Sequence, residues 1–286
     1  MDKVHQTTID LLPLKQADHL QLLELKKQGI LYCVASDESV ADRTDWGQRI
    51  GYFTQVNDVV VGYFILCPKG GFGELEELCL LPAYANHGIV QGVIAKSKAV
   101  GLAHDYSYLL TWTTTAFKLF FEQLGGQLSQ VVPATANGQE RLAYYLPVVD
   151  EPWIDLPTAG LVCLKGDRLL LAYSKNKKAW YLPGGKIDQG ENSQEALIRE
   201  IEEELSLVLQ PDRLSFLTRI VAPAYGEKKN RMMQQDCYVY ELMQDKIAIA
   251  NEIGGVQYFS LAEYTQGQIP VPGVLKVFDF LSTWKK

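Results

Sequence analysis

Apolar residues recur at two spacings in the first half of the chain, one typical of helices and one typical of strands. Residues 17–29, 88–105 and 116–126 repeat apolar positions every three or four residues, which predicts three helices. Four other segments are rich in β-branched and aromatic residues and are predicted to be strands: residues 51–56, 59–67, 74–81 and 106–114. Asn57 and Asp58 separate the first two of these strands and predict a hairpin turn. Together these elements indicate a mixed α/β domain.

A break in the pattern follows at residues 148–158, where two prolines and three acids stand close together. We interpret this stretch as a linker between two domains, residues 1–150 and 151–286. A length of 286 residues also favours two domains.

The second half predicts an α+β domain with a mixed sheet and helices on its faces. Residues 158–174 are expected to form a hairpin around Lys165, Gly166 and Asp167. Further segments predict a helix at about 192–206, strands near 214–221, 235–242 and 256–261, and a last helix over 273–284.

Composition narrows the classes of protein. Apolar residues make up 47% of the chain and charged residues 21%, as in soluble globular proteins. The N-terminal residues lack a signal-peptide pattern, and no apolar run approaches the roughly 20 residues that span a bilayer, so no membrane partner is expected. A net charge of −7 argues against a nucleic-acid polymer as partner. The five cysteines are widely spaced without a CxxC pair and predict buried thiols in a reducing compartment, hence a cytoplasmic protein.

A glycine-rich loop followed by an acidic helix is the candidate chemical site. Gly184 and Gly185 follow a predicted strand, and Glu191 precedes the helix. On that helix Glu200, Glu203 and Glu204 are spaced i, i+3 and i+4, so their carboxylates share one face. Such a face is either a solvated acidic surface or a site for a cation such as Mg²⁺, which prefers oxygen ligands. The preceding glycine loop, which lets the backbone approach another group closely, favours the cation site.

This segment resembles the Nudix box. Gly185, Glu191, Arg199 and Glu200 have the spacing of the box, as do the later positions Ile201, Glu203, Glu204 and Leu207. Ser206 stands where the box has glycine, which puts the end of the helix in question more than the carboxylates.

The resemblance covers about residues 155–286, and residues 180–191 look similar to the MutT type. It implies a Nudix α/β/α sandwich that hydrolyses the diphosphate of a small nucleotide-like molecule. It implies Glu200, Glu203 and Glu204, with the Gly184 carbonyl, as ligands of Mg²⁺ or Mn²⁺. Arg199 would orient a carboxylate, Glu191 or one of the ligands. Glu203, Glu204 and Glu252 are the alternatives for the group that accepts a proton from water.

The remaining candidates concern substrate binding. Lys186 could contact phosphate, alongside Gly185 and Glu191, and Trp180 or Tyr225 could stack on a base. Pro223 and Tyr225 lie 16 and 18 residues past the box. These spacings match two different Nudix subfamilies, so they do not select a substrate.

The first half resembles the GNAT acetyltransferase fold in residues 78–95 and 116–126. The resemblance implies that a helix N-terminus would hold the pyrophosphate of acetyl-CoA. Val90 departs from the small residue of that loop, and Phe121 stands where a catalytic Tyr is often found. Two interpretations therefore remain for this half: an acetyltransferase with atypical catalytic groups, with Glu76 or Glu77 as base, or a domain that keeps the fold for binding or homodimer formation. The chain as a whole could be a hydrolase, an acetyltransferase with an accessory Nudix domain, or a nucleotide-sensing regulator.

Overall fold

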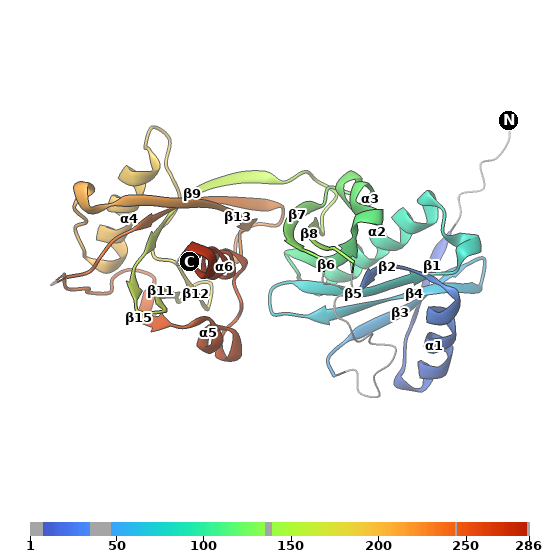
Figure 1. Cartoon of the computed structure of the whole chain (residues 1–286). Coiled ribbons are helices and arrows are strands. Elements are labelled where there is room, and N and C mark those ends of the chain that lie inside the picture. The colour runs from blue at the N-terminus through green and yellow to red at the C-terminus, as the bar shows by residue number, and fades with distance from the viewer. Residues whose placement is uncertain (1–7, 35–46, 135–138, 244, 285–286) are drawn as a thin grey trace. The chain divides into compact units, whose positions relative to one another are not determined.

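The computed structural model describes four stretches of the chain: residues 8–34, 47–134, 139–243 and 245–284. The chain divides into two compact units, Met1–Pro152 and Trp153–Lys286, each with its own sheets and apolar cores (Figure 1). Within the stretches described, no helix combines the length and the apolar character needed to cross a membrane.

Unit 1 contains one mixed sheet of eight strands, in the order β1-β3-β4-β5-β6-β8-β7, with β2 paired to β5. Its strands are β1 (Ile9–Pro13), β2 (Ile30–Val34), β3 (Ile50–Val56), β4 (Val59–Pro68), β5 (Gly73–Leu80), β6 (Tyr108–Thr114), β7 (Gln127–Val132) and β8 (Arg141–Pro147). The parallel pair β5 and β6 is joined only from Gly73 to Leu75. Beyond Leu75, β2 takes the edge of β5 in place of β6.

The predicted hairpin at Asn57 and Asp58 is confirmed. Both residues have positive φ, 51° and 63°, and they join Val56 to its partner Val59. Two successive left-handed residues match the right-handed twist of the flanking strands.

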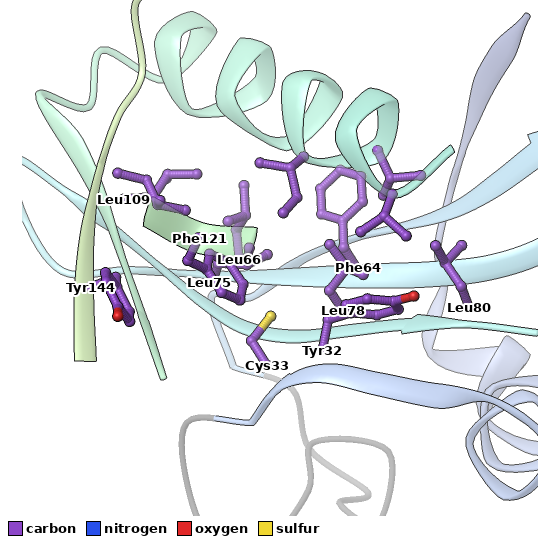
Figure 2. Packing of buried hydrophobic residues seen from close by; sticks show 14 of the residues in the cluster. Tyr32, Cys33, Phe64, Leu66, Leu75, Leu78, Leu80, Leu109, Phe121 and Tyr144 are labelled. Atoms are coloured by element: carbon purple, nitrogen blue, oxygen red, sulfur yellow. The ribbon is translucent and has the colours of Figure 1, made fainter. Parts of the chain in front are cut away.

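Helices cover both faces of this sheet. The predicted helices are present as α1 (His19–Gln28), α2 (His87–Ala103) and α3 (Lys118–Gln123), with short 3-10 turns at Gln16–Asp18, Pro82–Tyr84 and Thr115–Phe117. On one face, Phe64 and Leu78 of the sheet belong to the core that α2 and Phe121 of α3 cover (Figure 2). On the other face, Leu22 of α1 packs with Tyr63 in a separate cluster.

Unit 2 has two sheets, one in the order β13-β14-β9 and one in which β10 and β12 pair with one edge of β11 and β15 with the other. Its strands are β9 (Ile154–Val162), β10 (Leu164–Lys165), β11 (Arg168–Ser174), β12 (Ala179–Tyr181), β13 (Ser215–Pro223), β14 (Arg231–Val239) and β15 (Ile253–Phe259). Its helices are α4 (Ser193–Leu205), α5 (Leu261–Gly267) and α6 (Pro272–Trp284), with a 3-10 turn at Pro211–Arg213.

Alternate residues of β9 and β11 belong to two different cores. Leu161 of β9 and Leu170 of β11 pack in the core that contains α4, whereas Val162 and Leu171 pack in the core that contains α6. Because successive side chains of a strand point to opposite faces, the strands form a layer between helices. Unit 2 is therefore an α/β/α sandwich, as the sequence predicts.

The predicted linker is too long. β9 begins at Ile154, so residues 154–158 are strand and not linker. Pro157 pairs with Gln234 of β14, and β9 is the last strand of its sheet. Proline is tolerated at such an edge because its missing N–H need not serve a second neighbour. The short helix α5 was not predicted, although Ser260 and Glu263 form a capping box at its start.

The cysteines are free thiols, and only Cys67 is not fully buried. Burial raises the pKa of Cys33, Cys79, Cys163 and Cys237 to about 12. Because the thiolate is the reactive form, these four thiols are inert packing groups at neutral pH.

Ser206 ends helix α4 in the left-handed conformation, with φ of 49° and ψ of 35°, and its N–H bonds to the Glu202 carbonyl. Glycine is the usual residue at such a position because a Cβ is unfavourable there. Serine is accommodated, and the helix still stops at the expected residue.

Ser206→Gly should therefore stabilise unit 2 by about 0.5–1 kcal/mol, because it relieves the left-handed strain. Urea denaturation of the full chain measures the change. Ser206→Ala is the matched control and should give no gain, because alanine also carries a Cβ. Equal effects of both substitutions would contradict this account of the helix end.

Candidate active site

The glycine loop after β12 runs beside the edge of β9. Ala159 and Leu161 of β9 donate backbone hydrogen bonds to the carbonyls of Gly185 and Pro183, at 2.9 and 2.8 Å. The Gly184 carbonyl lies between these two and receives no backbone bond among the residues described. Gly184 has a φ of +130°, and a Cβ there would overlap the Ala159 carbonyl. Only glycine fits this path.

Gly185 brings the loop against the acidic helix. A Cβ at Gly185 would overlap the carboxylate of Glu200. The missing side chain therefore lets the Glu200 carboxylate lie directly against the loop backbone. This is the close approach that the sequence pattern predicts.

Helix α4 begins with a complete capping box. The Asn192 side chain accepts hydrogen bonds from the N–H groups of Gln194 and Glu195, and Glu195 accepts one from Asn192. These bonds satisfy amides that a helix start leaves without partners. Leu197 and Ile201 bury the apolar face against β9, so the acidic face is directed away from that core.

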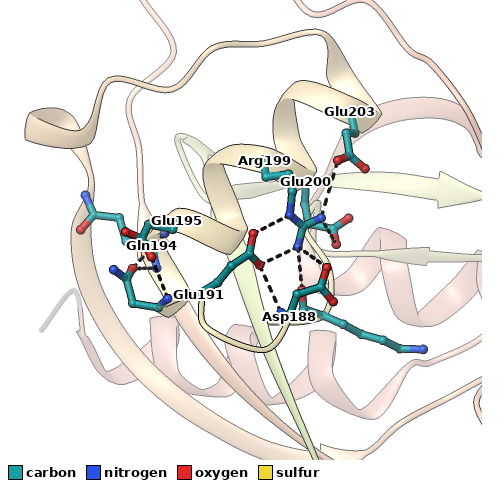
Figure 3. Close-up of polar contacts among 9 residues, drawn as sticks. Asp188, Glu191, Gln194, Glu195, Arg199, Glu200 and Glu203 are labelled. Carbon is teal, nitrogen blue, oxygen red and sulfur yellow. Dashed lines mark hydrogen bonds and ion pairs between the residues drawn. The ribbon is translucent and has the colours of Figure 1, made fainter.

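Arg199 holds the acidic residues in place (Figure 3). Its guanidinium donates to both carboxylate oxygens of Glu191, at 2.8 and 2.9 Å, and to Glu200 at 2.9 Å. It also donates to the Lys186 carbonyl at 3.1 Å and lies 3.7 Å from Glu203. One planar group thus joins the loop to the helix, with the bidentate geometry that arginine favours.

These contacts change the pKa values of Glu191 and Arg199. The hydrogen bonds from Arg199 lower the pKa of Glu191 to about 2, and the same bonds raise the pKa of Arg199. Glu191 therefore stays ionised and bound to Arg199 throughout the neutral range.

Glu204 has the opposite environment. It is 9% exposed and accepts one hydrogen bond, from the Gly184 N–H at 3.2 Å. Burial, with the nearby charges of Glu200 and Glu252, raises the pKa of Glu204 to about 7. A buried carboxylate with this pKa gains from any cation that comes close to it.

A cavity of about 360 Å³ adjoins these groups. Glu200, Glu204 and Glu252 line it together with Gly184 and Gly185. Its volume lies in the range of small-molecule sites.

Two lysines in the cavity lining pair with the same glutamate. Lys177 and Lys186 bind the two carboxylate oxygens of Glu227, at 2.9 and 3.0 Å. Burial opposes ionisation of Glu227, but the hydrogen bonds from the lysines lower its pKa. The carboxylate of Glu227 thus occupies a position that suits a small anionic group.

Most of the predicted site residues lie at the cavity or directly behind its lining. The cavity lining contains Gly184, Gly185, Lys186, Glu200, Glu204, Tyr225 and Glu252. Arg199 and Glu191 lie behind the lining and hold it, and Glu203 points to solvent with 54% of its side chain exposed.

Trp180 lies elsewhere than the sequence suggests. Its ring packs against Tyr173 and Phe259, and it is absent from the cavity lining. As a strand residue it packs, partly buried, against the aromatic core. Tyr225, the other aromatic candidate, does line the cavity, and its ring centroid lies 6.3 Å from that of Tyr181.

Sequence patterns did not single out Glu227 or Gln235, which also line the cavity. Glu227 follows the turn at Gly226, and nothing in the local sequence shows that it meets the two lysines. Gln235 lies within a strand whose alternation could have placed it on the inner face.

The donor set suits a hard cation. Glu200 and Glu204 offer carboxylate oxygens at the cavity, and the Gly184 carbonyl is unused by the backbone. Among the residues described, no three acidic, histidine or cysteine side chains converge as a complete metal site. Mg²⁺ often has only one or two protein carboxylates and completes its shell with water and substrate phosphate, so these residues fit it.

In unit 1, the residues at the positions of an acetyltransferase site are buried or already bonded to other groups. The Asn86 side chain caps α2 by accepting from Ile89, and Val90 is 1% exposed. Glu76 pairs with Arg49, and Glu77 accepts from the Tyr63 hydroxyl. Phe121 is wholly buried.

The match to known proteins agrees with the site in unit 2. The family model described as the NUDIX domain matches residues 155–276. The matched residues lie within unit 2 and include the glycine loop and helix α4.

Several solved structures are similar at low identity. A MutT/nudix family protein from Enterococcus faecalis is 20% identical over 39% of this chain and 46% of that one, with a TM-score of 0.33. A bifunctional NMN adenylyltransferase/ADP ribose pyrophosphatase from Francisella tularensis is 19% identical over 46% and 42%, with a TM-score of 0.38. A MutT NUDIX hydrolase from Burkholderia pseudomallei is 22% identical over 44% and 95%, with a TM-score of 0.37. This chain spans less than half the length of the first two proteins. No curated protein matches it.

Gly185→Ala should destabilise unit 2 by about 1–3 kcal/mol, because the added Cβ overlaps Glu200. Urea denaturation measures the loss. Gly267→Ala is the control, since a Cβ there meets no atom within 4 Å. A loss no larger than that of the control would show that the loop does not press against Glu200.

The pair of Glu191 and Arg199 should stabilise the fold in a pH-dependent way. The pKa of Glu191 falls from an unfolded value of about 4.3 to about 2, so its contribution is fully present above about pH 4.3 and is lost as pH falls toward 2. The free energy of unfolding of wild type should exceed that of Glu191→Gln at pH 7 by more than at pH 3. A difference that stays constant between these pH values would contradict the assigned contact.

Proposed function

We propose that unit 2 is a Mg²⁺- or Mn²⁺-dependent hydrolase that splits the diphosphate of a small nucleotide-like molecule. The observation that carries the proposal is one cavity whose lining includes the carboxylates of Glu200, Glu204 and Glu252 and two lysines, Lys177 and Lys186. Carboxylates suit the cation, and lysines suit the phosphates that accompany it. The match of residues 155–276 to the NUDIX family model supports the same class.

Glu200 and Glu204 would hold the cation, with the Gly184 carbonyl as a third oxygen. The bound cation would neutralise charge on the diphosphate and lower the pKa of the attacking water. Arg199 fixes Glu200 and joins it to the loop through Glu191. Glu203, exposed and outside the cavity lining, is the weakest of the three predicted ligands.

Lys177 and Lys186 would bind the diphosphate in place of the Glu227 carboxylate. The exchange keeps both ammonium groups paired, because an anionic oxygen replaces another. It also leaves Glu227 free to move with its turn at Gly226.

Glu252 is the proposed proton acceptor. It lines the cavity, lies close enough to raise the pKa of Glu204, and has no role in holding the cation. The water oxygen would form a bond to phosphorus while the bridging P–O bond breaks. The bonding pair would leave on the departing phosphate, and the water proton would pass to Glu252.

For unit 1 we propose a GNAT-like domain that serves binding or dimer formation and not acetyl transfer. The burial of Val90 and Phe121 supports this choice. Val90 packs in the core where the loop of the resembling fold has a small residue, and the Ile89 N–H at the start of α2 is already bonded to the Asn86 side chain. Phe121 has no hydroxyl to give a proton.

The test is release of phosphate or pyrophosphate from nucleoside triphosphates, nucleotide sugars, ADP-ribose and dinucleotides with Mg²⁺. Wild type should turn over at least one member, and Glu204→Gln should lose at least about 100-fold in kcat/KM. Glu202→Gln, on the exposed side of the same helix, is the matched control and should keep activity. Glu252→Gln should lower kcat more than it raises KM, because it acts on the proton and not on binding.

Turnover that survives both Glu204→Gln and removal of metal would contradict the proposed site. Tight binding of nucleotides with no turnover of any member would favour a nucleotide sensor instead.

A further inference from the structure

The end of helix α4 is bonded to a segment that lies far along the chain. Three successive carbonyls of its last turn accept hydrogen bonds from residues 248–251. The carbonyls of Glu203, Glu204 and Leu205 accept, in that order, from the side-chain amide of Asn251 at 2.8 Å and from the backbone N–H groups of Ala250 and Ala248, both at 2.9 Å. Carbonyls at the end of a helix have no partner within the helix, so this segment supplies the missing donors.

The charge at this end of α4 makes these donors important. The C-terminal end of a helix carries a partial negative charge. Helix α4 nevertheless ends with three successive glutamates, residues 202–204, and its last turn has no basic side chain. The donors of residues 248–251 offset the partial charge on the carbonyls, so this segment stabilises the helix that presents the acidic face.

Asn251 suits its position in two ways. Its φ is 50°, in the left-handed region that asparagine adopts more readily than most residues with a Cβ. Its side-chain amide also gives the donor for the Glu203 carbonyl. The Asn251 carbonyl in turn accepts a hydrogen bond from the Lys175 ammonium at 2.7 Å. Asn251 therefore joins the end of α4 to the residue that follows β11.

Glu252 comes next in the chain and is held by the same neighbours. Its carbonyl accepts a hydrogen bond from the backbone N–H of Lys175 at 3.0 Å. Its side chain lines the cavity together with Glu200 and Glu204 of α4. The place of the Glu252 carboxylate relative to these two is therefore set by bonds on both sides of Asn251.

We propose that Asn251 is a positioning residue for Glu252: its amide ties the loop that carries this carboxylate to the end of α4, so the proton acceptor keeps its place beside the cation site. Asn251 does not itself line the cavity, so it acts through Glu252. This inference rests on the proposed function, in which Glu252 accepts the proton. A small displacement of such an acceptor lowers the rate of proton transfer more than it weakens binding.

The test is initial-rate kinetics of the full chain, with Mg²⁺ and the member of the nucleotide panel that wild type hydrolyses fastest. Asn251→Gly keeps the left-handed backbone and removes the amide, so it should lower kcat about 10-fold. KM and the Mg²⁺ concentration for half-maximal activity should change by less than about 2-fold, because the groups that bind substrate and cation are unchanged. Asn57→Gly, the same substitution at a left-handed turn of unit 1, is the matched control and should keep kcat.

Asn251→Asp is the second variant. It keeps the size of the side chain, but a carboxylate cannot donate to the Glu203 carbonyl, so kcat should fall at least as far as in Asn251→Gly. Full kcat in either variant would overturn the proposal.

A double variant separates positioning from a general loss of structure. If Asn251 acts through Glu252, Asn251→Gly should lower kcat by less than about 2-fold further in a Glu252→Gln background. Losses that multiply in the double variant would contradict the positioning role.

Hydrogen–deuterium exchange keeps this inference apart from the proposed function. Asn251→Gly should speed exchange of the Ala248 and Ala250 amides about 10-fold and leave that of Leu161 in β9 unchanged. Faster exchange at these two amides, with no turnover of any panel member by wild type, would sink the hydrolase and uphold the tie between the loop and α4. Turnover that falls in Asn251→Gly while exchange stays as in wild type would uphold the hydrolase and sink the positioning role.

Discussion

The bonds of Arg199 are the interaction on which the geometry of the site depends. Glu191 and the Lys186 carbonyl belong to the loop, and Glu200 belongs to helix α4. These groups would otherwise repel or drift, since two of them are anions on separate segments. A single guanidinium satisfies all three, and the carboxylates that face the cavity are fixed as a result. Lysine could not replace it, because an ammonium lacks the planar fork.

The site also depends on where side chains are missing. Gly184 lets the loop turn beside β9, Gly185 admits the Glu200 carboxylate, and Gly160 admits the amide of Gln235. The charged groups of the cavity therefore approach the backbone more closely than a chain with Cβ atoms at these positions would permit. Their burial follows, and with it the raised pKa of Glu204.

Local sequence patterns predict much of this structure. The capping residue Asn192, the apolar stripe of α4 and the hairpin at Asn57 each depend on neighbours within a few residues, so periodicity and turn chemistry predict them. Local sequence patterns do not predict contacts between segments that are distant in the chain. Glu227 meets Lys177 and Lys186 only because the strands bring three separate loops together. Trp180 lies next to the motif in the sequence, but its ring packs against Tyr173 and Phe259 and not in the cavity lining.

Strand β9 contributes residues both to the cavity and to the core beneath α4. Its residues Leu156 and Thr158 line the cavity, while Ala159 and Leu161 belong to the core beneath α4. Because the side-chain period of a strand is two, inserting one residue within β9 would exchange these two sets along the rest of the strand. Extra residues just before Ile154, outside the pairing with β14, would meet no such penalty. The tolerance of this chain to changes in length should thus alter abruptly at the first residue of β9, within a few positions of the join between the two units.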